Sequence, residues 1–224
     1  MLGQTYAADP TPGRHTTSAG LYYSVSAIWK DVSWLPEFRT HKKSEDYENT
    51  FETAIQNVAY TAFKMLIDAA GGCYYAMLTG LKHYRLFDYL NAATGLDLTP
   101  DEYIETGRRI QNLRQQFNAL HGVDTSTFRP HPRVTGEELM KTGHNAGLSL
   151  KTDALVASYR KAWGWDAETG YPLSTTLKKY GIDSLLGGPT EAFVRESGAS
   201  DTYSDPVRET SGFAPSGRST TAGR

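Results

Sequence analysis

The stretch TAIQNVAYTAFKMLIDAAGGC, residues 53–73, decides which kind of fold this sequence forms. Its large apolar residues recur every three or four positions, which is the spacing of one buried face of a helix. Two glycines follow at 71 and 72, and glycine is typical of a helix end. We therefore predict a buried helix from about residue 49 to Ala70. Directly after it comes Cys73, the single cysteine of the chain.

A second helix has the clearest start signal. Thr99-Pro100-Asp101-Glu102 is a capping box with proline at the first helical position, and Gly122 is a suitable end. We expect the core-facing side of this helix to be apolar and its arginines to form a solvated face. The predicted core residues are Tyr103, Ile104, Ile110, Leu113, Phe117 and Leu120, and the predicted outer residues are Arg108, Arg109, Arg114 and Gln115.

The remaining helices are shorter. We predict them over residues 84–93, 152–163 and 174–180, with one more short helix near residues 20–30. The tryptophans at 163 and 165 are expected in the core. Strand patterns are sparse, so the predicted fold class is mainly α, an irregular helical bundle.

Composition divides the chain into three parts. Residues 1–50 show little periodicity, and the polar stretch 4–15 has the character of a loop from the middle of a larger protein. Residues 51–187 form the predicted helical domain, and 188–224 a tail. Residues 197–224 hold six Ser, four Thr, four Gly and two Pro among 28, a composition that cannot offset the entropy of ordering. We therefore expect this tail to be disordered.

The overall charge excludes several kinds of partner. The 224 residues carry a formal net charge of -2, which gives no field for nucleic acid or an anionic membrane. No apolar run reaches the roughly 18 residues of a membrane span. The first residues lack the basic flank and apolar segment of a signal peptide. One cysteine suits a reducing compartment, so we expect a cytoplasmic protein.

One segment combines several residues that could bind a ligand, and it is Asp68-Ala69-Ala70-Gly71-Gly72-Cys73. A thiol just past a helix end can be reached by a ligand, glycines allow a bulky group to approach the backbone, and Asp68 can accept hydrogen bonds from a heterocycle. On spacing alone, a buried thiol behind a helix terminator is the commoner explanation.

The wider sequence resembles the C-terminal helical region of the tungsten-containing aldehyde ferredoxin oxidoreductases, from about Ala54 to Leu186. The segment 68–73 resembles that family's D-x-x-G-L-C motif, with Gly72 in place of the usual leucine. The similarity continues through NAATGLDLTPDEY at 91–103, GRRI at 107–110 and Phe117-Asn118. It resumes in LVASYRKAWGWD at 155–166, Gly170-Tyr171-Pro172 and LKKYGI at 177–182.

This resemblance implies roles for individual residues. Cys73 would be the last of four thiolate ligands to a [4Fe–4S] cluster. Asp68 would bond one pterin of a tungsten- or molybdenum-bis-pterin cofactor, with the backbone of Gly71 and Gly72 close to that pterin. The family oxidises aldehydes to carboxylic acids and passes electrons through the cluster to ferredoxin.

The same resemblance implies that the chain is incomplete as a catalyst. A [4Fe–4S] cluster needs about four thiolates, and this chain has one. We therefore expect a fragment or subunit that works with a missing N-terminal half or partner subunit. The alternative is a helical interaction or remnant domain without activity. Within the enzyme class, a substrate other than a small aldehyde, such as an aromatic thioester, stays open.

Other candidate residues have weaker support. Asp9, Arg14 and His15 lie among turn formers, where we favour a turn with a solvated arginine over a pocket-lining loop. A nucleophilic pair of Cys73 with His83 would make an independent cysteine-dependent enzyme, but the sequence supplies no orienting third group. Three further histidines lack metal-ligand spacing and are expected at the surface: His121, His131 and His144.

Overall fold

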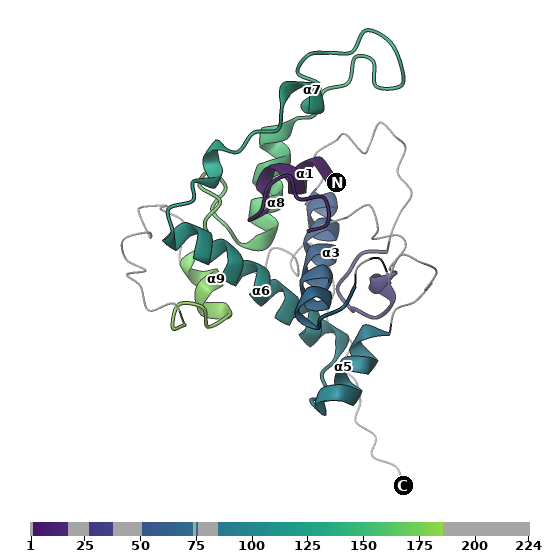
Figure 1. Cartoon of the computed structure of the whole chain (residues 1–224), viewed down its shortest axis with the longest axis vertical. Coiled ribbons are helices and arrows are strands. Elements are labelled where there is room, and N and C mark those ends of the chain that lie inside the picture. The colour runs from purple at the N-terminus through teal and green to yellow at the C-terminus, as the bar shows by residue number, and fades with distance from the viewer. Residues whose placement is uncertain (1, 18–26, 38–50, 74, 76–84, 186–224) are drawn as a thin grey trace.

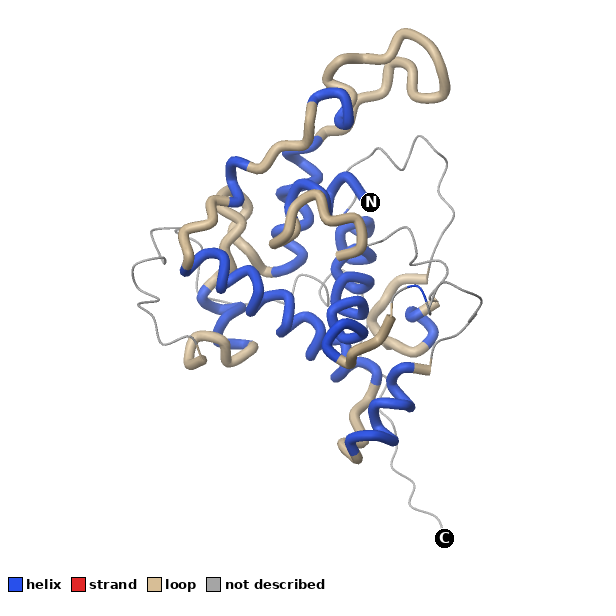
Figure 2. Tube along the Cα trace, viewed as in Figure 1, coloured by secondary structure: helices blue, strands red, loops and turns tan. Residues whose placement is uncertain are grey.

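The computed structural model describes residues 2–17, 27–37, 51–73, 75 and 85–185. Within these ranges the chain forms helices and loops without a β-strand, and one isolated antiparallel bridge joins Trp165 to Pro172 (Figure 2). The mainly α fold class is therefore confirmed. The elements are α1 Leu2–Ala8, η2 Ile28–Lys30, α3 Phe51–Ala69, α5 Leu86–Thr94, α6 Pro100–Leu120, η4 Thr125–Thr127, α7 Pro132–Thr135, α8 Thr152–Trp163 and α9 Ser174–Lys179.

Helix α3 is the centre of the molecule. It packs against α6 and α8, and α1 lies on α8 (Figure 1). Every residue from Ala54 to Ile67 is buried, so α3 is covered on all sides and not on one stripe alone. At the crossing with α6, Gly107 lies directly on the backbone of Ala62. A Cβ atom at 107 would be 2.0 Å from the Ala62 carbonyl oxygen, so no residue other than glycine fits this crossing.

The sequence predicted the boundaries of most helices. Thr99 and Glu102 form the expected reciprocal capping box at the start of α6, with Pro100 at the first helical position. Helix α5 ends at Gly95, which adopts a left-handed conformation with φ 71°. Helices α8 and α9 match their predicted spans within one residue. Near residues 20–30 the structure has the short η2, and residues 18–26 lie outside the described part of the chain.

The predicted faces of α6 are right for Tyr103, Ile104 and Arg109 but wrong for Arg108, Gln115 and Phe117. Its buried side is largely polar and includes Arg108, which is 1% exposed, and Gln115, which is fully buried. Phe117, expected in the core, is 53% exposed. The reason is the nature of the neighbours, which present polar groups to α6. Trp165 Nε1 donates to Asn112 Oδ1 at 2.7 Å, and Gln115 Nε2 donates to the Gly170 carbonyl at 2.7 Å.

The expectation of a loop at residues 4–15 is wrong for its first part, because residues 4–8 belong to α1. Tertiary packing overrides the weak local propensity here. Gln4 is buried between helices: its Nε2 donates to the Leu155 carbonyl at 2.9 Å, and its Oε1 accepts from Asn57. These bonds attach α1 to both α8 and α3.

The aromatic cluster after α8 is part of the core, as predicted. Trp163 and Trp165 are stacked with ring centroids 5.6 Å apart, and both are buried. The tail after residue 185 lies outside the described residues. In the described part of the chain, no helix combines the length and the hydropathy that crossing a bilayer requires.

Candidate functional site

The C-terminal end of α3 places Asp68, Gly71, Gly72 and Cys73 on one short turn. The Gly71 N–H donates to the Asp68 carbonyl at 3.1 Å, and the Gly72 N–H donates to the Ile67 carbonyl at 2.8 Å. These two bonds define a Schellman motif, which needs a left-handed residue at its centre. Gly71 fills that position with φ 72°. The chain therefore leaves the helix sharply, and Cys73 is exposed.

Asp68 lies at the rim of this turn with a buried partner. Its side chain is 40% exposed, and one carboxylate oxygen pairs with the ammonium group of Lys64, one helical turn earlier. Lys64 is 3% exposed, so the pair joins the interior of α3 to its exposed end. The second oxygen, Oδ2, accepts no hydrogen bond from the described part of the chain. Sequence reasoning missed Lys64 because lysine within an apolar helix has no motif of its own.

The two glycines are explained by different constraints. A Cβ atom at Gly71 would meet nothing within 4 Å, so glycine is needed there for its positive φ and not for space. A Cβ atom at Gly72 would lie 2.8 Å from Ile67 Cγ2, a side-chain atom that has to move to admit it. The leucine that is usual in the resembling motif therefore requires Ile67 to adopt another position.

The donor set fits a cofactor only in part. An exposed thiol and a half-exposed carboxylate on one turn suit a group that approaches from outside. Among the described residues, however, no three His, Cys, Asp or Glu side chains gather to hold a metal ion. With one cysteine in the sequence, this chain can supply one corner of an iron–sulfur cluster and no more.

Comparison with known proteins identifies the origin of this architecture. Residues 1–182 match the family model described as aldehyde ferredoxin oxidoreductase, domains 2 & 3. The chain belongs to the aldehyde ferredoxin oxidoreductase family. The match includes residues 1–53, which lie before the stretch that carried the sequence resemblance. The helical fold, without a strand in the described ranges, agrees with the family's C-terminal domains.

Individual relatives are similar over part of their length. The chain is 35% identical over 118 residues to the tungsten-containing aldehyde ferredoxin oxidoreductase of Pyrococcus furiosus, which covers 52% of this chain and 19% of that protein. It is 30% identical over 145 residues to the protein of the same name from Pyrococcus abyssi, covering 64% and 23%. The chain thus matches about a fifth of the length of these family members.

The other residues singled out in the sequence do not join this turn. Arg14 and His15 are exposed, which agrees with the expected turn and its solvated arginine, whereas Asp9 in the same loop is 1% exposed. Its Oδ1 accepts from Thr11 and its Oδ2 accepts from Gln111 Nε2 at 2.8 Å. Burial raises the pKa of the Asp9 carboxyl, although these bonds and the nearby Arg114 oppose that rise. His83 lies outside the described residues, and three other histidines are exposed: His121, His131 and His144.

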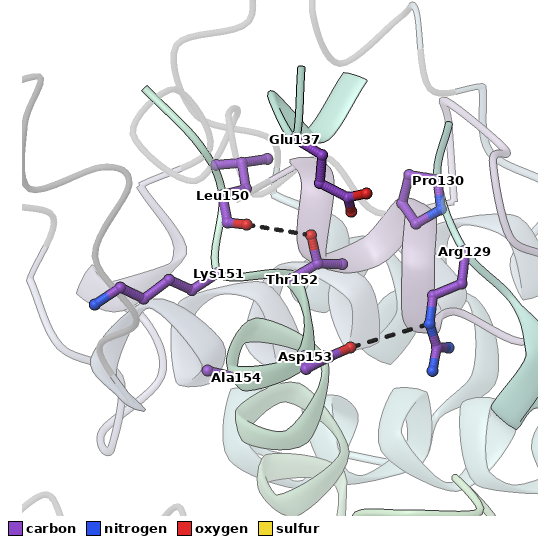
Figure 3. A pocket seen from close by; sticks show the side chains of 8 residues that line it. All are labelled: Arg129, Pro130, Glu137, Leu150, Lys151, Thr152, Asp153 and Ala154. Carbon is purple, nitrogen blue, oxygen red and sulfur yellow. Dashed lines mark hydrogen bonds and ion pairs between the residues drawn. The ribbon is translucent and has the colours of Figure 1, made fainter. Parts of the chain in front are cut away.

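The described surface also has two depressions away from the turn. A cleft of about 430 Å³ lies at the start of α8, below the segment that carries α7 (Figure 3). Arg129 and Asp153 face each other across it at 4.0 Å, and Glu137 and Lys151 add one charge of each sign. The positive and negative charges of the cleft therefore balance, so the cleft favours neither an anionic nor a cationic ligand. The second depression, a groove of about 310 Å³, lies between residues 10–11 and α6.

Proposed function

We propose that this chain is the C-terminal part of a tungsten- or molybdenum-pterin oxidoreductase that converts aldehydes to carboxylic acids. In this proposal, electrons from the aldehyde leave through a [4Fe–4S] cluster to ferredoxin. The observation that supports it most is the turn at the end of α3, where Asp68 and Cys73, the residues that resemble the family's motif, are both accessible.

Each residue of the turn has a proposed task. The Cys73 thiolate would bind one iron of the cluster. Asp68 Oδ2 would accept a hydrogen bond from a pterin N–H, while Oδ1 stays on Lys64. This division would leave Oδ2 available to the pterin. The pterin-bound metal would supply the oxidation chemistry, and the chain's own residues would bind and orient the cofactor.

The proposal requires a second polypeptide region. About three further thiolates must come from outside these 224 residues, either from an upstream part of the same protein or from a partner subunit. Catalysis by residues 1–224 alone is therefore not expected.

The test is metal loading under anaerobic conditions. The chain is produced alone and together with a candidate upstream region or partner polypeptide that carries further cysteines. Iron, sulfide and the tungsten-pterin cofactor are supplied, and bound metals are measured. We expect both metals to be retained only in the combined preparation. In that preparation, Cys73→Ser should lose iron, and Asp68→Asn should lose tungsten more than iron.

Asp88→Asn is the matched control, because Asp88 is an exposed acid that also pairs with a nearby cation, Arg85, the N-cap residue of α5. This variant should load both metals like the wild type. If neither metal is retained by the combined preparation, or if Cys73→Ser keeps its iron, the proposal is wrong. The chain is then better described as a helical interaction or remnant domain.

A further inference from the structure

The groove beside α6 has a composition that points to a ligand. Its lining comes from the loop after α1 and from the second half of α6, and none of it belongs to the turn at residues 68–73. A volume of about 310 Å³ is at the small end of the range for ligand sites, which are mostly apolar with a few polar groups. The lining residues are Pro10, Thr11, Leu113, Arg114, Phe117 and Asn118.

Arg114 is the charged residue of this groove, and not all of its N–H donors have an acceptor in the described part of the chain. Its Nη1 donates to Gln111 Oε1 at 2.5 Å and to Met65 Sδ at 3.2 Å, and its Nη2 donates to Thr11 Oγ1 at 3.0 Å. A guanidinium has five N–H donors. The Nε–H and the second Nη2–H therefore have no acceptor in the described part of the chain. The three existing bonds hold the guanidinium in place and leave two donors for a ligand.

The nearest acid does not pair directly with Arg114. Both oxygens of Asp9 are occupied, Oδ1 by Thr11 and Oδ2 by Gln111. Burial raises the pKa of Asp9, and its hydrogen bonds and the electrostatic attraction of Arg114 oppose that rise. Gln111 lies between the two groups, since its amide nitrogen donates to Asp9 and its amide oxygen accepts from Arg114. The groove therefore presents a fixed cation that no carboxylate of the described residues contacts.

The rest of the groove is apolar. Phe117 is 53% exposed, and its ring stacks on His121 with centroids 4.0 Å apart. Leu113 and Pro10 complete the apolar wall, and the Asn118 amide is held by the Pro10 carbonyl at 2.8 Å. That bond fixes the loop against α6. An exposed aromatic ring beside a guanidinium suits a ligand with a hydrocarbon body and one anionic end.

We propose that this groove binds a small organic carboxylate, with the carboxylate on Arg114 and the hydrocarbon part on Phe117 and Leu113. Carboxylate is preferred because a guanidinium can bind it through two parallel N–H bonds. The site needs no metal or pterin, so it stands independently of the function proposed for the turn at 68–73.

The test is a titration of the purified full chain with benzoate, followed by calorimetry or by ligand-observed NMR. Benzamide is the uncharged analogue of the same shape. We expect saturable binding of benzoate and binding of benzamide weaker by at least about tenfold, because a bidentate charged contact is lost. Equal binding of both compounds, or no saturable binding of benzoate, would overturn the proposal.

Two variants and one control locate the site. Arg114→Gln should abolish the preference for benzoate over benzamide. Phe117→Ala changes an exposed side chain and should weaken benzoate more than acetate, which provides a second test if Arg114→Gln does not fold. Arg129→Gln, in the other depression, should bind benzoate like the wild type. If Phe117→Ala keeps full benzoate affinity, or if Arg129→Gln loses it, the groove is not the binding site.

Discussion

At the level of single residues, Gly107 imposes the strictest requirement on this fold. Its Cα lies so close to α3 that an added methyl group would be 2.0 Å from a backbone oxygen, which cannot move without shifting the helix. Gly107→Ala should therefore lower the free energy of unfolding by about 3 kcal/mol, at the upper end for overpacking. Urea denaturation measures this change in the free energy of unfolding.

Gly3→Ala in α1 is the control, because its new methyl group would meet only the flexible end of Leu150, at 3.2 Å. A neutral Gly107→Ala would contradict the crossing described here.

Glu105 gives a prediction about pH. Burial alone would raise the pKa of Glu105, but Arg108, Lys179 and the Tyr180 hydroxyl outweigh burial and lower the pKa below its ordinary value near 4.5. A carboxyl whose pKa is lower in the folded state stabilises the protein above the unfolded pKa and loses this effect as pH falls.

We expect the wild type to be more stable than Glu105→Gln at pH 7, and the difference to shrink below about pH 4.5. Urea titrations at pH 7, 4.5 and 3.5 check this. A difference that stays constant with pH would exclude the electrostatic explanation.

At the level of elements, the turn that joins α8 to α9 depends on one arginine. Arg160 is 4% exposed, and its guanidinium donates to the carbonyls of Ala167 at 3.0 Å, Glu168 at 2.7 Å and Thr125 at 3.0 Å. Arg160→Met removes these bonds and leaves carbonyls without a donor. We expect the free energy of unfolding to fall by about 3 kcal/mol, roughly 1 kcal/mol for each bond.

Arg129→Met, on an exposed arginine, should change stability by less than about 0.5 kcal/mol. Thermal and urea unfolding of both variants compare them, and equal stability would show that Arg160 does not hold the turn.

The helices also show which features of the fold could be predicted from the sequence and which could not. Helix starts and ends follow from local signals, such as the capping box at Thr99 and the glycine at 71, and these predictions are confirmed. The buried face of α6 depends on distant partners, the indole of Trp165 and the carbonyl of Gly170, so periodicity could not reveal it. The candidate sites also differ in whether they could be predicted from local sequence. The segment 68–73 is recognisable because it is contiguous, whereas Lys64 and the Asp9–Gln111–Arg114 network become visible only after folding.

At the level of the whole molecule, exposed apolar side chains suggest a surface that another polypeptide covers. The segment around α7 projects from the helical body (Figure 1). It exposes Val134 by 61%, Leu139 by 57% and Met140 by 55%. Hydrogen bonds within the segment, Gly147 N–H to the Met140 carbonyl at 3.0 Å and Leu150 N–H to the Thr135 carbonyl at 2.7 Å, give it a defined shape. Such a projection is a site of association when its partner is missing.

We therefore expect the chain expressed alone to self-associate. In sedimentation velocity, the average mass should rise with protein concentration, because apolar groups on the projection are buried between copies. The double variant Leu139→Ser with Met140→Ser should reduce this rise while leaving the unfolding free energy nearly unchanged, since neither side chain belongs to the core. Tyr89→Ser with Leu96→Ser, which are 60% and 61% exposed at the other end of the molecule, is the matched control. A strictly monomeric wild type would contradict the prediction. An equal effect of both double variants would show that apolar exposure in general, and not the projection, drives the association.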